Sequence, residues 1–136
     1  MKLLALVTAV LVSVFPSGHA HASKSKSLCS QWRNHAVLAG WQVKDLATLD
    51  YIMHRESRCL PHALNTTRNR DGSWDYGLTQ INNKTWCLPS RFYKNGYLQT
   101  MGIVKDCKEL LNPFTNLVAA LAVYEAAGNR FSPWGL

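Results

Sequence analysis

The sequence has 136 residues, with 15 lysine and arginine residues against 8 aspartate and glutamate residues, so its formal net charge is +7 at pH 7. A basic protein is attracted to polyanions such as nucleic acid, anionic lipid or bacterial cell wall, and charge alone does not choose among them. Because the basic residues are spread along the chain rather than gathered in one stripe, the sequence argues against a nucleic-acid-binding or membrane-active protein.

The N-terminal segment has the pattern of a secretory signal peptide. Lys2 supplies a positive charge, residues 3–15 are largely apolar, and residues 20–22 read Ala-His-Ala, which is typical of a cleavage site. The apolar stretch is shorter than the roughly 20 residues that span a bilayer, and this disfavours a membrane anchor. We therefore expect a cleaved signal peptide over residues 1–22, secretion to the extracellular space or periplasm, no stable membrane insertion, and one domain over residues 23–136.

The four cysteines all lie in the expected mature domain, at Cys29, Cys59, Cys87 and Cys107. An even number of cysteines in an exported domain predicts two disulfides, and the count alone leaves three connectivities open. No Cys-x-x-Cys pair occurs, which argues against a zinc site.

The first half of this domain is expected to contain two helices. The first covers residues 30–39 and ends at Gly40. The second runs from about residue 43 to Arg55 or Glu56, because apolar residues recur in it at helical spacing. These residues are Leu46, Leu49, Ile52 and Met53. On a helical wheel Glu56 falls on the same apolar side.

The remaining elements follow from turn and capping signals. Residues 61–67 read as a loop, and residues 69–73 (Asn-Arg-Asp-Gly-Ser) form a strong turn signal, so short strands on either side would make a small hairpin. A short helix is expected around residues 105–111. Asn112-Pro113 then opens a long helix that ends near Ala127. The predicted fold class is α+β, mainly α, with a small β-hairpin or sheet.

The most informative motifs lie between residues 54 and 87. Glu56-Ser57 ends a helix, residues 71–82 read DGSWDYGLTQIN, and Trp86-Cys87 closes the stretch. The run Asp-Gly-Ser-x-Asp-Tyr-Gly-x-x-Gln-Ile-Asn resembles that of chicken-type lysozymes. The Glu-Ser and Gly-Leu-x-Gln-Ile motifs, together with residues 122–128, also resemble soluble lytic transglycosylase (SLT) domains. The resemblance to this lysozyme-like superfamily implies a lysozyme-like fold and favours the disulfides Cys29–Cys59 and Cys87–Cys107.

Glu56 is the candidate catalytic acid. Cleavage of a glycosidic bond needs a proton delivered to the leaving oxygen, and a carboxyl group does this near neutral pH only when its pKa is raised. Burial among apolar side chains raises a carboxyl pKa, and the end of the apolar stripe suits that need. The resemblance also implies that Glu56 is the acid. The alternative is a helix-end glutamate that pairs with Arg55 or Arg58.

Asp75 is the second candidate catalytic residue. It aligns with the nucleophilic or charge-stabilising aspartate of chicken-type lysozymes, and the alternative is a structural strand-end aspartate. Lytic transglycosylases typically lack it and use the 6-hydroxyl of muramic acid as the nucleophile, so Asp75 mildly favours hydrolysis while the choice between the two reactions stays open. Asp71 is expected only to form the turn.

Four further residues are candidate substrate-binding residues. Gln80 and Asn82 match positions that line the cleft in the family, although they could instead satisfy backbone groups. Tyr124 matches the transglycosylase tyrosine that lies near the acid, and simple core packing is its alternative. Trp74 could stack on the apolar face of a sugar ring.

These features predict a monomeric glycosidase (lysozyme) or lytic transglycosylase that acts on bacterial peptidoglycan, at the β-1,4 bond between N-acetylmuramic acid and N-acetylglucosamine. Neither a metal nor an organic cofactor is expected, because carboxyl groups and water or a substrate hydroxyl suffice for this chemistry. The main alternative is a catalytically inactive, lysozyme-like sugar-binding module.

Overall fold

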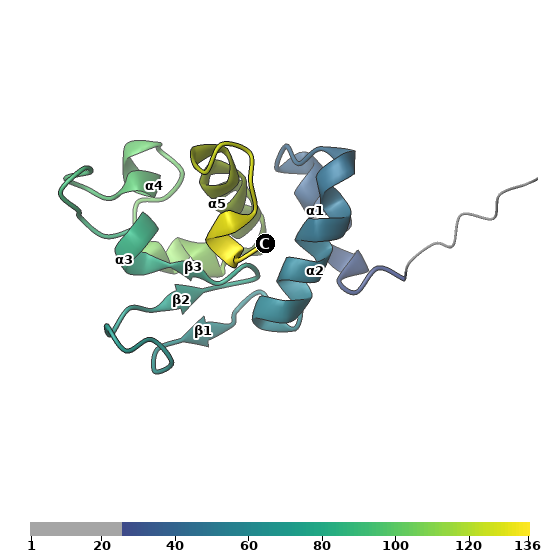
Figure 1. Cartoon of the computed structure of the whole chain (residues 1–136), viewed down its shortest axis with the longest axis horizontal. Coiled ribbons are helices and arrows are strands. Elements are labelled where there is room, and N and C mark those ends of the chain that lie inside the picture. Colours follow the sequence, from purple (N-terminus) through teal and green to yellow (C-terminus); the bar gives the residue numbers. More distant parts are fainter. Residues whose placement is uncertain (1–25) are drawn as a thin grey trace, which may run out of the picture.

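A computed structural model describes residues 26–136 of the chain. The expected signal peptide, residues 1–22, lies outside the described residues. Within them, no helix has both the length and the apolar character needed to cross a membrane. The architecture is α+β and mainly helical (Figure 1), as the sequence predicts.

Two helices form the first part of the fold, close to their expected positions. A 3-10 turn, Ser30–Trp32, leads into α1, Arg33–Leu38, and a second 3-10 turn, Val43–Asp45, leads into α2, Leu46–Ser57. The predicted apolar stripe of α2 is buried, since none of its members is more than 4% exposed: Leu46, Leu49, Ile52 and Met53. Glu56 lies in the last turn of α2. In Figure 1 the end of this helix lies beside the sheet that follows.

The sheet has three short antiparallel strands in the order β1-β2-β3, namely Leu64–Asn65, Asp75–Tyr76 and Ile81–Asn82. The predicted hairpin around residues 69–73 is confirmed as β1 and β2. However, β1 occupies part of the segment that was expected to be loop, and β3 adds a further strand. The register aligns Asn65 with Asp75 and Asp75 with Asn82, so these three polar residues form one row across the sheet.

The second half of the chain is built from short helices around one long one. These are α3 (Asn83–Trp86), α4 (Tyr97–Thr100), a 3-10 helix (Cys107–Leu111), α5 (Pro113–Ala126) and a final 3-10 turn (Ser132–Trp134). The predicted start of α5 is confirmed, because the Asn112 side chain accepts a hydrogen bond from Thr115 N and Pro113 occupies the first turn. Figure 1 shows α5 between α1 and the α3–α4 region, with the C-terminal turn lying toward α2.

Asn116 joins α5 to the sheet from inside the core. Its side chain is fully buried. Its amide nitrogen donates to the carbonyl oxygens of Tyr76 and Leu110, each at 2.9 Å. Its amide oxygen accepts from the N–H and the hydroxyl of Thr79, at 3.0 and 2.8 Å. The residue thereby fixes β2 and the turn that leads to β3 against α5.

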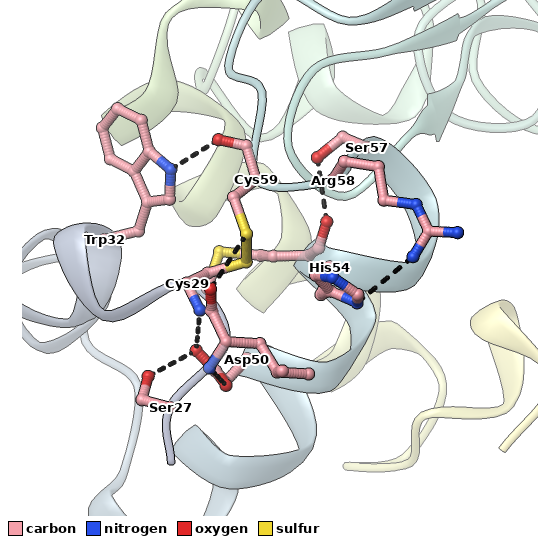
Figure 2. The surroundings of a disulfide bond; sticks show 10 residues. Ser27, Cys29, Trp32, Asp50, His54, Ser57, Arg58 and Cys59 are labelled. Atoms are coloured by element: carbon pink, nitrogen blue, oxygen red, sulfur yellow. Dashed lines mark hydrogen bonds between the residues drawn. A yellow bond between two sulfur atoms is a disulfide. The ribbon is translucent and has the colours of Figure 1, made fainter.

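Both disulfides expected from the resemblance are present, Cys29–Cys59 and Cys87–Cys107. Figure 2 shows the first, which joins the segment before α1 to Cys59, two residues after the end of α2. Nearby, the carboxylate of Asp50 accepts hydrogen bonds from Ser27 Oγ, Leu28 N and Cys29 N. The covalent link and these bonds hold the two ends of the α1–α2 unit together.

Candidate functional site

An open cleft lies between the last turn of α2, the polar row of the sheet and the C-terminal turn. One part of it has a volume of about 360 Å³, which is within the usual size of small-molecule sites. Glu56 lines it from α2, Asp75 and Asn82 line it from the sheet, Gln80 lines it from the turn between β2 and β3, and Trp134 lines it from the C-terminal turn. The fold thus brings four of the six predicted site residues into one cleft.

Asp75 is the most tightly held carboxylate of the cleft. One of its oxygens accepts from Asn65 Nδ2 at 2.9 Å and from Asn69 Nδ2 at 2.7 Å, and the other accepts from Asn82 Nδ2 at 2.8 Å. Asn65 and Asn82 can make these bonds because they flank Asp75 in the register of the sheet. Three side-chain amides therefore fix the orientation of this carboxylate.

Glu56 has a different setting from the apolar one expected for it. Its side chain is 27% exposed, and its Oε1 accepts from Arg55 Nη2 at 2.6 Å and from Arg55 Nε at 2.9 Å. Arg55 Nη2 also donates to the carbonyl of Trp134, and the hydrogen bond to Glu56 raises the pKa of Arg55. The alternative from the sequence, an ion pair between Arg55 and Glu56, is therefore present. Glu56 nonetheless lines the cleft.

Gln80 and Asn82 combine lining the cleft with local structural roles. Gln80 has a left-handed backbone, with φ of 50°, and its side-chain amide donates to the carbonyls of Ala63 and Gly77. Asn82 caps α3 by accepting from Thr85 N at 3.1 Å, while its amide nitrogen donates to Asp75 and to Ser73 Oγ. The alternative role considered from the sequence, hydrogen bonding to other protein groups, is thus one that both residues have.

The other two predicted site residues lie elsewhere. Tyr124 is 6% exposed; its ring packs 4.7 Å from that of Phe131, and its hydroxyl donates to Asp45 at 3.3 Å. It lines a separate pocket with Lys44 and Asp45. Trp74 is 41% exposed but does not line the cleft with Glu56.

Sequence reasoning missed several lining residues that only the fold brings into the cleft. Asn65 and Asn69 lie in segments read as loop and turn, and their role depends on the strand register. Arg68 and Trp134 line the same cleft, and nothing in their local sequence indicates this. For Asn65 and Asn69, the sequence does contain a signal, because several asparagines flank the turn next to Asp75.

Comparisons with known proteins agree with this architecture. No family model matches the chain. Residues of this chain are 35% identical over 82 residues to human lysozyme-like protein 6, covering 60% of this chain and 47% of that protein. They are 38% identical over 53 residues to the mouse protein of the same name, covering 39% of this chain and 31% of that protein. The matches thus span about half, or less, of the length of these curated relatives. Together with the mainly helical α+β architecture, this similarity supports a lysozyme-like fold for the chain.

Proposed function

We propose that this protein is a secreted glycosidase that hydrolyses the β-1,4 bond between N-acetylmuramic acid and N-acetylglucosamine in bacterial peptidoglycan. The observation that carries the proposal is that Glu56 and an aspartate held by three side-chain amides, Asp75, line one open cleft. A pair of carboxyl groups on one cleft is the arrangement that most glycoside hydrolases use. The two disulfides fit an exported protein.

The two carboxyl groups have different tasks in this mechanism. Glu56 delivers a proton to the glycosidic oxygen as the bond breaks. Positive charge then develops on the sugar ring, and the carboxylate of Asp75 stabilises it. The fixed orientation of Asp75 suits this task, because a preoriented charge needs no rearrangement at the moment of reaction.

The hydrogen bonds from Arg55 to Glu56 Oε1 must give way before Glu56 can deliver a proton to the glycosidic oxygen. Breaking this ion pair costs little free energy. The Arg55 and Glu56 side chains are 34% and 27% exposed, and such solvent-exposed pairs contribute only about 0–1 kcal/mol. Hydrogen bonds to a bound substrate can replace those that Arg55 makes to Glu56.

Hydrolysis is favoured over transglycosylation by the positions of Asp75 and Tyr124. Asp75, which resembles the lysozyme residue, lines the cleft with Glu56. Tyr124, which resembles the transglycosylase residue, packs in the aromatic core and bonds to Asp45. The cleft thus offers the residue that a hydrolase uses and not the tyrosine that the transglycosylase resemblance suggested.

The test is mass analysis of the sugar products from purified peptidoglycan, with wild-type protein beside Glu56→Gln. We expect reducing-end muropeptides from the wild type and almost none from Glu56→Gln, which should remain folded because it breaks only an exposed ion pair. The thermal melting curve of the variant checks that it is folded.

Three other results would change the proposal. Products lighter by one water, with 1,6-anhydro ends, would replace hydrolysis by lytic transglycosylation. Wild-type turnover by Glu56→Gln would remove Glu56 as the acid. If neither protein gave products but both bound glycan strands, the protein would be a sugar-binding module instead.

A further inference from the structure

The cleft continues beyond the two carboxyl groups into a second part that is rich in arginine. This part has a volume of about 500 Å³ and shares five lining residues with the first, namely Arg55, Glu56, Asn65, Arg68 and Gln80. It adds Arg58, the residue that ends α2 in a left-handed conformation, with φ of 56°. We call this second part the arginine half of the cleft.

The charge of the arginine half is positive. Its lining includes three arginines, Arg55, Arg58 and Arg68, and a single acidic residue, Glu56. The part that contains Asp75 is instead balanced, with two arginines and two carboxylates. An imbalance of this kind, confined to one end of a cleft, attracts a negatively charged group of the ligand to that end.

The three guanidinium groups are available to a ligand to different extents. Arg58 and Arg68 are exposed, and within residues 26–136 the one side-chain hydrogen bond of Arg58 is a long one of 3.5 Å to His54 Nδ1. Arg55 is partly engaged with Glu56 and with the carbonyl of Trp134. Arginine binds carboxylates well because its planar fork matches the two carboxylate oxygens.

Glycan strands with muramic acid carry such groups beside the sugar backbone. The lactyl side chain of each muramic acid ends in a carboxyl group, which is either free or extended by a peptide with its own carboxylates. A strand bound with its scissile bond at Glu56 would have carboxylates within the neighbouring part of the cleft. The ligand chemistry needed by the arginine half is therefore present on the proposed substrate, and absent from a neutral glycan.

We propose that the arginine half binds a carboxylate of the muramyl side chain and so makes the protein selective for anionic over neutral glycan strands. This inference rests on the proposed function for its choice of glycan. It assigns Arg58 and Arg68 as specificity-determining residues. Arg55 adds to the same positive surface, and a carboxylate bound there competes directly with Glu56 for its guanidinium.

The test is titration calorimetry with soluble, uncrosslinked peptidoglycan strands and with the same strands after their carboxylates are converted to methylamides. Glu56→Gln serves as the parent protein so that no strand is cleaved during the titration. A triple variant adds Arg58→Gln and Arg68→Gln. The matched control adds Lys105→Gln and Lys108→Gln instead, which removes the same charge from exposed positions outside the cleft.

We expect the parent to bind carboxylated strands about fivefold more tightly than amidated ones, as two exposed arginine–carboxylate contacts can provide. The variant lacking Arg58 and Arg68 should lose this preference and keep its affinity for amidated strands, while the lysine control should keep the preference. Peptide-free strands, whose lactyl carboxylates are free, separate the two sources: preference retained on them assigns the lactyl group, and preference lost assigns the peptide.

Two results would overturn the inference. Equal binding of carboxylated and amidated strands by the parent would remove the arginine half as a carboxylate site, and a preference that survives the loss of both arginines would remove Arg58 and Arg68 as the specificity-determining residues. Neither result bears on the proposed hydrolysis, because the product analysis with wild-type protein tests that reaction separately. Conversely, a protein that cleaves nothing but shows the expected preference would retain this site and lose the proposed activity.

Discussion

Asp75→Asn is the substitution that best separates the structural role of Asp75 from the catalytic role proposed for it. In the native protein the carboxylate accepts three hydrogen bonds, two on one oxygen and one on the other. Asparagine keeps one acceptor oxygen, which can retain the pair from Asn65 and Asn69. The amide nitrogen of the substituted side chain then faces Asn82 Nδ2, so that two hydrogen-bond donors oppose each other.

The expected cost in stability follows from these contacts. One hydrogen bond to a charged group is lost, worth about 1.5–3 kcal/mol, and the other two become neutral and weaker. The loss is moderated because Asp75 is only partly buried and because Asn82 Nδ2 keeps its bond to Ser73 Oγ. We therefore expect a loss of about 2 kcal/mol in the free energy of unfolding, which lowers Tm by about 8 °C for a domain of this size.

The catalytic cost should be larger than this structural one. Under the proposed function, removing the negative charge of Asp75 should lower kcat/KM on peptidoglycan about 100-fold, the usual scale for one electrostatic stabiliser. Asn69→Ala is the matched control, since it removes one bond to the same carboxylate, and another to the carbonyl of Ser73, but keeps the charge. It should show a similar fall in Tm with only a small loss of activity.

The assay is the rate of release of reducing ends at a temperature well below the Tm of both variants. If Asp75→Asn were as active as Asn69→Ala under these conditions, the negative charge of Asp75 would have no catalytic role. The residue would then only hold the strands in register, and the reasoning that assigns hydrolysis from its position would be refuted.

Two further predictions concern how the fold supports the cleft. Asn116→Leu should lower the free energy of unfolding by about 3–5 kcal/mol, because it leaves two backbone carbonyls and both polar groups of Thr79 unpaired in the core; a loss below about 1 kcal/mol in denaturant unfolding would contradict this account. Gly77→Ala should cost about 2–4 kcal/mol, since φ is +73° and the new Cβ would collide with the carbonyl of Leu110. Gly72→Ala, with a similar φ but open space around it, should cost only about 1 kcal/mol in the same measurement.

The elements that the sequence predicts correctly are those set by local physical chemistry. The start of α5 at Asn112-Pro113 follows from the capping of free N–H groups. The buried stripe of α2 follows from the spacing of its apolar residues. Residues 69–73 fold as a turn between strands because Asp-Gly accepts positive φ. In each case the signal and its consequence lie within a few residues of one another.

What only the tertiary structure decides is which distant side chains meet. The row of Asn65, Asp75 and Asn82 depends on strand register, and register is a property of paired segments that no single segment encodes. The sequence places Glu56 on an apolar side, yet the packing of the C-terminal turn brings the carbonyl of Trp134 to Arg55 and holds that guanidinium on the carboxylate. Tyr124 resembles a site residue, and helix packing directs it into the aromatic core instead. The sequence alone determines α1, α2, α5, the turn and the presence of two carboxyl groups, because these follow from local patterns. The setting of each carboxyl group in the cleft follows from long-range contacts.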